Sequence, residues 1–460
     1  MKALLPALAL ILLAPTVSAA PPSPQALMAT AAKLRDQALT GDNTAYATVE
    51  SLTTEVGQRI AGSPAAKRAA DWGVARMKAL GFENVHIEPF PITAWSRGAE
   101  SAEVVAPFPQ KLSITGLGGS VPTPAGGVEA EAVIFPTYRA LLDAPMGSLT
   151  GKIAVVTQAM IKFQGGDDYG TLNANRRAGP SEAAKRGAVA YLLRSLSTDD
   201  TRLPHTGFMN YAPDAPKIPA AALSTPDGAL LDNMAKRGKP IRIRLLLNSS
   251  SFPAEGFTVS GEIKGREKPD EMLVIGGHLD SWDLGTGAID DAAGIAITTA
   301  AAKLVADNGR PRRTIRVYMF GAEEIAASNI AFAAMHQAES AKMVVGAEAD
   351  FGGDKVLRVN LPPGAAETTF GKDLADVLSP ILIRPGPPAL NAGDDFNNLK
   401  GVPFFGLRQD GNRYFDLHHS ADDTLDKIDP AQLNHAVAAW AATLYMIAES
   451  DVDFRATMPK

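Results

Sequence analysis

Residues 272–280 read MLVIGGHLD, an apolar run that ends in two glycines, a histidine, a leucine and an aspartate. Similar apolar runs recur further along the chain, and helical patterns separate them. Near-continuous apolar runs are typical of parallel strands that are buried on both faces. Their alternation with helices predicts an α/β fold with a doubly wound, mostly parallel sheet. We expect strands at Met272–Ile275, Ile315–Phe320, Met343–Ala347 and Val402–Leu407, with helices at Ala292–Asp307, Ile325–Gln337 and Thr369–Leu378.

Histidine and carboxylate side chains follow these strands at the points where the strands end. His278 follows the first strand, Glu323 and Glu324 follow the second, and Asp350 follows the third. Ligands of open α/β sheets bind just outside the carboxyl ends of the strands. We therefore expect these side chains to share one edge of the sheet. Further candidates for the same edge are Asp280, Asp290, Asp291, His418 and His419.

Each of these groups has a simpler interpretation when it is taken alone. An isolated His-x-Asp is usually a hydrogen-bonded pair, and adjacent acids such as Asp290 and Asp291 are favoured at helix starts. His418 and His419 can be one buried and one exposed histidine. The recurrence of these residue types after one core strand after another instead favours a metal site. Five imidazole or carboxylate ligands suit a pair of zinc-like ions that share one bridging carboxylate.

Composition restricts the chemistry further. The chain of 460 residues contains no cysteine, which excludes disulfides, thiolate ligands and a cysteine nucleophile. Any metal must then be held by histidine and carboxylate side chains. The 50 acidic and 44 basic residues give a net charge of −6, and no run of lysine or arginine is dense enough for a nucleic-acid footprint. We exclude nucleic acid as a partner.

The first residues match a signal peptide. Lys2 precedes an apolar run from Ala3 to Ala14, and the small-residue stretch Val17–Ala20 follows. The apolar run is too short to cross a bilayer, which takes about 20 residues. We expect residues 1–19 to be removed after Ala19. The mature protein is then exported to the periplasm or the medium without a membrane anchor.

A second α/β pattern interrupts the first one. It follows the turn-rich stretch GLGGSVPTPAG at residues 116–126. We predict an inserted α+β domain over residues 117–256 and a discontinuous main domain over residues 24–116 and 257–460. The insert has no recognisable site of its own, so we expect it to wall the active-site cleft. Its expected elements are strands at 153–156, 188–193, 219–223 and 241–247, and helices at 181–186 and 227–237.

The string GGHLDSWDLGTGAIDDAAG at residues 276–294, followed in order by GAEE, EAD and HHSADDT, resembles the co-catalytic dizinc aminopeptidase family. The insert resembles the protease-associated domain of that family, through Gly151-Lys152 and residues 184–188. The resemblance implies two Zn²⁺ ions per chain. It implies that Asp290 bridges them, that His278 and Asp350 complete one metal site, and that Glu324 and His419 complete the other.

The resemblance also assigns the supporting residues. Glu323 would be the general base, Asp280 would support His278, and the peptide bond between Asp290 and Asp291 would be cis. His419 is preferred to His418 because the family ligand lies four residues before an Asp-Thr pair. The tyrosine that stabilises the oxyanion in some members has no counterpart in Asn391–Asp395. Either Asp394 or Asp395 reads a substrate amine there, or these acids begin a helix.

The implied activity is hydrolysis of dipeptides or short peptides with a free N-terminus. A metal-bridged hydroxide would be the nucleophile, and the resemblance further implies a homodimer. Three alternatives remain: a non-catalytic receptor of the same fold, a glutaminyl-cyclase-like transferase with a single zinc, and a binding module that uses the insert. The complete ligand set with Glu323 argues against the receptor, and the metal count separates the cyclase.

Overall fold

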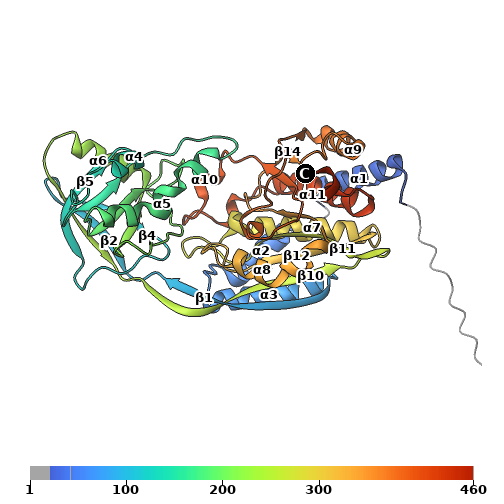
Figure 1. The fold of residues 1–460 in the computed structure, drawn as a ribbon, viewed down its shortest axis with the longest axis horizontal. Coiled ribbons are helices and arrows are strands. Elements are labelled where there is room, and N and C mark those ends of the chain that lie inside the picture. The colour runs from blue at the N-terminus through green and yellow to red at the C-terminus, as the bar shows by residue number, and fades with distance from the viewer. Residues whose placement is uncertain (1–20, 42, 459–460) are drawn as a thin grey trace, which may run out of the picture.

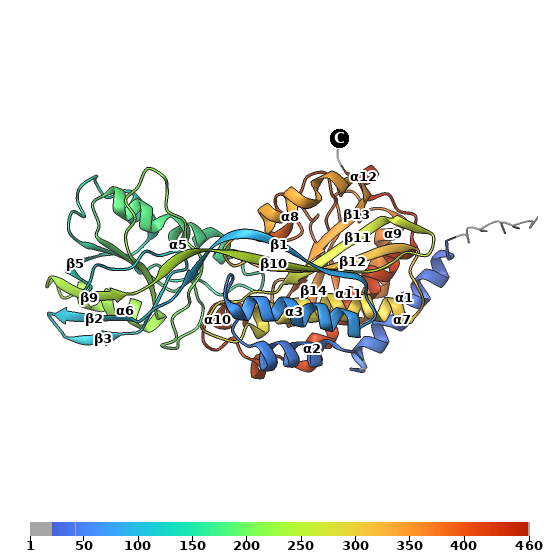
Figure 2. The same cartoon turned by 90° about the horizontal axis from the view of Figure 1, so that it is seen from below.

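A computed structural model describes residues 21–41 and 43–458. The predicted signal peptide, residues 1–19, lies outside the described residues. Figures 1 and 2 show two lobes joined by two long strands, β1 (Glu83–Ser96) and β10 (Ser250–Ile263). We call residues 100–247 the second lobe and the rest of the described chain the main lobe. No helix in the described ranges has the length and apolar content needed to cross a membrane.

The main lobe is built on a five-stranded sheet in the order β1-β10-β12-β11-β13. Strand β11 (Lys268–His278) lies between β12 (Arg313–Phe320) and β13 (Met343–Glu348) and runs parallel to both. Strand β10 is antiparallel to β12, and β1 is antiparallel to β10. The predicted α/β class is confirmed. The sheet is less parallel than predicted, because the two connecting strands add antiparallel pairs at one edge.

Helices cover both faces of this sheet because successive side chains of a strand point in opposite directions. Leu273 and Ile275 of β11 belong to the core cluster that contains α7 and α11, while Met272 and Val274 share a second cluster with Phe332 of α8. The helices of the main lobe are α1 (Pro24–Leu39), α2 (Ala45–Ser51), α3 (Pro64–Ala79), α7 (Ala293–Asp307), α8 (Ser328–His336), α9 (Thr369–Leu378), α10 (Tyr414–Leu417), α11 (Pro430–Glu449) and α12 (Phe454–Thr457).

The prediction of a main-sheet strand at Val402–Leu407 is wrong. The observed strand β16 (Gly406–Gln409) pairs with β14 (Val356–Asn360) in a separate three-stranded sheet that also contains β15 (Arg384–Pro385). Phe404 meets the main sheet through an isolated bridge to Gly346. Val402 and Phe405 are buried in core clusters, so the apolar run reflects burial and not a full strand ladder.

The second lobe contains an eight-stranded sheet in the order β3-β2-β9-β5-β6-β7-β8-β4. This sheet begins at Glu100, so the predicted domain boundary at residue 117 lies too late. Helix α5 begins at Asp167 instead of the predicted residue 181. The elements are β2 (Glu100–Ala106), β3 (Gln110–Leu112), β4 (Ile114–Gly116), β5 (Val128–Phe135), α4 (Tyr138–Leu142), β6 (Ile153–Val156), α5 (Asp167–Lys185), β7 (Ala190–Arg194), β8 (Ala220–Leu223), α6 (Thr225–Ala235) and β9 (Ile241–Leu247).

Candidate metal centre

The five predicted ligands meet at the carboxyl edge of the parallel strands. His278 is the last residue of β11, and the loops after β12 and β13 carry Glu324 and Asp350. Asp290 lies between two groups of side chains. Its Oδ1 is 2.9 Å from Nε2 of His278, and its Oδ2 is 3.3 Å from Nε2 of His419. His278 Nε2 is also 3.6 Å from Asp350 Oδ1, and His419 Nε2 is 3.0 Å from Glu324 Oε2.

Several carboxylate oxygens in this cluster fit a bound cation. Asp290 Oδ2, Glu324 Oε1 and Asp350 Oδ1 are buried and have no hydrogen-bond partner among the described residues. A buried carboxylate oxygen without a partner is costly, because it loses its hydration. Coordination to a cation would repay that loss. Groups of three potential ligand atoms that lie within 4.8 Å of one another also occur here. The donor set is therefore that of a metal site.

Two neighbours of the predicted ligands, Asp291 and His418, also belong to this cluster. Asp291 accepts hydrogen bonds from the backbone N–H groups of His278 and Gly294, at 2.9 and 3.0 Å, so both its oxygens are occupied. His418 stacks on His419 with ring centroids 3.4 Å apart, and its Nε2 is 3.7 Å from Asp290 Oδ2. Both histidines are buried, so the alternative of one exposed histidine is wrong.

Asp280 positions the loop that carries the predicted base. Its Oδ1 accepts from the backbone N–H of Ala322 at 2.8 Å and of Glu323 at 3.0 Å, and its Oδ2 accepts from that of Glu324 at 3.3 Å. The carboxylate was expected to support His278, but its nearer oxygen is 3.7 Å from His278 Nδ1. The main-chain carbonyl of Asp280 lies closer, at 3.0 Å. The three loop amides compete for the carboxylate and hold it away from the imidazole.

The electrostatics of the centre follow from its excess of buried acids. Burial, together with Asp350, Glu324 and Asp395, raises the pKa of Glu323 well above its usual range. Burial disfavours the charged form of His419, but Glu324 and Asp290 outweigh it and raise the pKa of that imidazole to about 9. Without a cation the cluster therefore retains protons at neutral pH. The peptide bond between Asp290 and Asp291 is cis, as expected.

The second lobe holds the His418–His419 segment in place. Thr206 donates its backbone N–H to the carbonyl of His419 at 3.0 Å, and its own carbonyl lies 3.3 Å from His419 Nδ1. His205 Nδ1 is 2.6 Å from the carbonyl of His418, and its Nε2 is 3.4 Å from Asp199. His205 is buried and contacts the residue that precedes the predicted ligand His419.

Helix α5 of the second lobe forms one wall of the pocket over the cluster. The pocket has a volume of about 170 Å³, and Glu323, Glu324, Asp350 and His419 lie on its main-lobe side. The prediction that the insert walls the cleft agrees with this arrangement. Sequence reasoning missed the pocket residues on α5, although their spacing of four and three residues was a usable signal. They are Tyr169, Asn173, Arg176 and Arg177.

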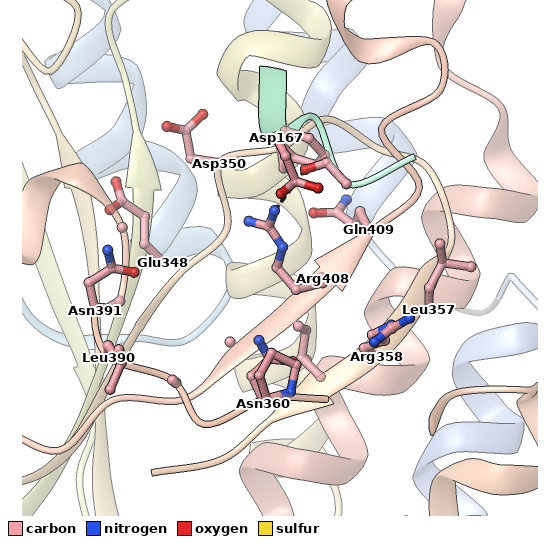
Figure 3. Close-up of a pocket in the computed structure, with 18 of the residues that line it drawn as sticks. Asp167, Glu348, Asp350, Leu357, Arg358, Asn360, Leu390, Asn391, Arg408 and Gln409 are labelled. Atoms are coloured by element: carbon pink, nitrogen blue, oxygen red, sulfur yellow. Dashed lines mark hydrogen bonds between the residues drawn. The ribbon is translucent and has the colours of Figure 1, made fainter. Parts of the chain in front are cut away.

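A larger cavity of about 830 Å³ adjoins the cluster. Figure 3 shows Glu348 and Asp350 on one side of this cavity and Arg358, from β14, on the other. Arg408 projects from β16 opposite Arg358 and lies 5.2 Å from the ring centroid of Phe351. Asp394 lines both cavities. The metal cluster is thus open to a space large enough for more than one amino-acid side chain.

A mixed β-sheet flanked by helices, with this histidine and carboxylate cluster at its strand ends, indicates a metallopeptidase. Residues 258–444 match the model of "Peptidase family M28". The chain is 36% identical over 420 residues to carboxypeptidase Q of Bos taurus, covering 88% of this chain and 86% of that protein. The chain belongs to peptidase family M28, as the motifs predicted.

Solved structures agree with this family. A peptidase M28 precursor from Shewanella amazonensis SB2B is 41% identical, with a TM-score of 0.91 over 94% of this chain and 98% of that one. A zinc aminopeptidase from Bacillus subtilis is 18% identical, with a TM-score of 0.63 over 87% of this chain and 93% of that one. At that identity the second likeness concerns the fold alone.

Proposed function

We propose that the chain is an exported exopeptidase with two zinc ions, which hydrolyses dipeptides or short peptides that have a free N-terminus. The position of Asp290 is the observation that carries this proposal. Its two oxygens lie 2.9 Å from His278 and 3.3 Å from His419, so one carboxylate stands between two sets of ligands. Nitrogen and oxygen donors of this kind suit zinc. Family membership and the zinc aminopeptidase fold neighbour support the choice of metal.

The residues of the chain divide the work of peptide hydrolysis. His278 and Asp350 would hold one zinc ion, Glu324 and His419 the other, and Asp290 both. When bound, the ions supply an activated water and polarise the scissile carbonyl. Glu323 accepts the proton of that water and passes it to the leaving amine.

Burial raises the pKa of Glu323 above its usual range, which makes this carboxylate a stronger proton acceptor. The hydrogen bonds from its loop to Asp280 fix the backbone of Glu323 beside the metal ligands.

The acids around the pocket favour a substrate with a free amine. Asp394 and Glu348 line the cavity next to Asp350, so an ammonium group placed there would have carboxyl oxygens as hydrogen-bond acceptors. We assign the second lobe as the protease-associated domain that walls this cleft. Export rests on the signal-peptide pattern of residues 1–19, and a homodimer is proposed on the family resemblance.

Metal content and turnover, measured together, test the proposal. Purified mature protein should hold two zinc ions per chain and should hydrolyse dipeptides, but not the same dipeptides with an acetylated amine. One zinc ion per chain with cyclisation of N-terminal glutamine would move the protein to the cyclase class. A protein with neither metal nor turnover would be a receptor on a peptidase scaffold.

A further inference from the structure

One face of α5 presents polar side chains to the metal cluster. Tyr169, Asn173, Arg176 and Arg177 follow one another at helical spacing, so they project from the same side of the helix. All four line the pocket that Glu323, Glu324 and Asp350 line from the main lobe. Figure 3 shows Asp167, the first residue of α5, among the residues that line the adjoining cavity together with Asp350. The pocket therefore has an acidic wall and a basic wall.

The basic wall lacks counter-ions. Arg176 is 3% exposed, and among the described residues neither Arg176 nor Arg177 has a carboxylate oxygen within 4.0 Å. Nε of each arginine is buried without a hydrogen-bond partner in the described ranges. A buried guanidinium without an anion is costly, since it gives up its hydration. This arrangement indicates a site for an anionic ligand.

The nearest polar contacts of Arg176 do not satisfy its charge. Its Nη1 lies 3.5 Å from the carbonyl of Thr206 and 3.5 Å from Nδ1 of His419. If Nε2 of His419 binds a metal ion, Nδ1 carries the proton of the neutral ring and cannot accept a hydrogen bond. Bound zinc would also add positive charge on the far side of that imidazole. Apart from the ring of Tyr169, whose centroid lies 5.4 Å from the guanidinium of Arg176, the pocket leaves Arg176 and Arg177 available to a substrate anion.

The geometry of a dipeptide fits these two walls. With its scissile carbonyl beside Glu323, a dipeptide has its free amine on one side of the bond and its carboxylate one residue away on the other. A guanidinium fork binds a carboxylate through two parallel hydrogen bonds, and an amide side chain can add a third donor. In a longer peptide or a C-terminal amide, no charge would stand at that position.

We propose that α5 binds the free C-terminal carboxylate of a dipeptide substrate, with Arg177 and Asn173 as its direct partners and Arg176 as the buried charge behind them. This inference rests on the proposed exopeptidase function and assigns the residues that would select dipeptides. Arg177 and Asn173 are specificity-determining residues, and the second lobe contributes to substrate recognition as well as covering the site.

The test compares dipeptides with their C-terminal amides. For the zinc-loaded wild type we expect kcat/KM for the free acid to exceed that for the amide by about 10- to 100-fold, the range for a buried charge-assisted hydrogen bond. In Arg177→Met the ratio should fall to about one, mainly through KM. Arg177→Lys should restore part of it, since it keeps the charge without the fork. Arg139→Met, an exposed arginine of the same lobe, is the matched control.

Binding without turnover gives a second readout. Calorimetry on zinc-loaded Glu323→Gln should show tighter binding of the dipeptide than of its amide, and the added Arg177→Met change should remove that difference. A wild type that shows no preference for the acid would overturn the inference. So would an Arg177→Met variant that loses both substrates equally, because the arginine would then act on the reacting carbonyl. Zinc content below two ions per chain would instead count against the proposed function.

Discussion

The two walls of the pocket were built in different ways. The acidic wall consists of side chains that follow consecutive parallel strands, so the topology of the sheet brings them together. The basic wall is one face of α5, a helix of the second lobe with its eight-stranded sheet. This helix lines the pocket because the two lobes pack against each other. The acidic wall has buried carboxylate oxygens without a hydrogen-bond partner among the described residues, and the basic wall has buried guanidinium nitrogens without one. On our proposal, the main lobe carries the catalytic groups and α5 adds recognition of the substrate carboxylate.

Removing the base from the acidic wall should have the largest effect. Glu323→Gln should lower kcat by about 10²- to 10⁴-fold, because proton transfer by a positioned carboxylate contributes about that factor. Zinc content should stay unchanged, since Glu323 is not among the proposed ligands. Elemental analysis and steady-state kinetics on a dipeptide measure both quantities. Glu367→Gln, on an exposed carboxylate, is the control; wild-type turnover in the Glu323→Gln variant would remove the assigned role.

Replacing each of the two adjacent histidines in turn tests which one is a zinc ligand. His419 faces both Asp290 and Glu324, whereas His418 approaches Asp290 alone, at 3.7 Å. We expect His419→Ala to lose one of the two zinc ions and His418→Ala to keep both. The zinc content of each variant after dialysis measures this difference. The reverse pattern would transfer the ligand role to His418.

The contact of the second lobe with His419 should have an intermediate effect. His205→Gln removes the imidazole that lies 2.6 Å from the carbonyl of His418 and 3.4 Å from Asp199. Residues that orient metal ligands typically change metal affinity by about 10- to 100-fold when they are replaced. Competition with a chelator would measure the loss, and His86→Gln, on an exposed histidine, is the control. Equal zinc affinity in both variants would mean that the contact of His205 with His418 does not orient the ligand.

Charges on the outer face of the second lobe should matter least. Glu129 pairs with Arg242 and Arg244 across β5 and β9, at 3.1 and 2.8 Å, in contact with solvent. Exposed ion pairs contribute little because water and salt screen them. Glu129→Gln should leave the melting temperature, zinc content and kcat/KM unchanged within error. If this variant lost the preference for a dipeptide over its C-terminal amide, that preference could not be assigned to the pocket arginines rather than to the surface arginines.

The sequence predicted the acidic wall far better than the basic one, and the reason is physical. His278, Glu324 and Asp350 each follow a buried apolar run, so the periodicity that reveals the strand also places the residue. Arg176 and Arg177 lie in a segment that contains Gly170, Asn173 and Pro180, which are poor helix formers, and most of α5 went unrecognised. Tertiary packing overrides that local preference.

Strand boundaries failed for a related reason. The strands β2, β3 and β4 precede the turn-rich stretch at residues 116–126, the predicted border of the insert. β2 pairs with β9 and β4 pairs with β8, each more than 100 residues further along the chain, and no local pattern records such a pairing. The apolar run at Val402–Leu407 failed in the opposite sense, because burial in a core produces the same residue types as a central strand.

The hydrogen bonds between Thr206 and His419 have a consequence for how the protein can be divided. The long strands β1 and β10 suggest a main lobe that could be trimmed by joining their ends with a short turn. Such a shortened chain would retain every proposed zinc ligand and the base. It would lose the carbonyl that faces the Nδ1 of His419 and the arginines that line the pocket. We therefore expect the trimmed chain to hold zinc less tightly than the full chain, because the second lobe supplies part of the surroundings of the proposed ligands.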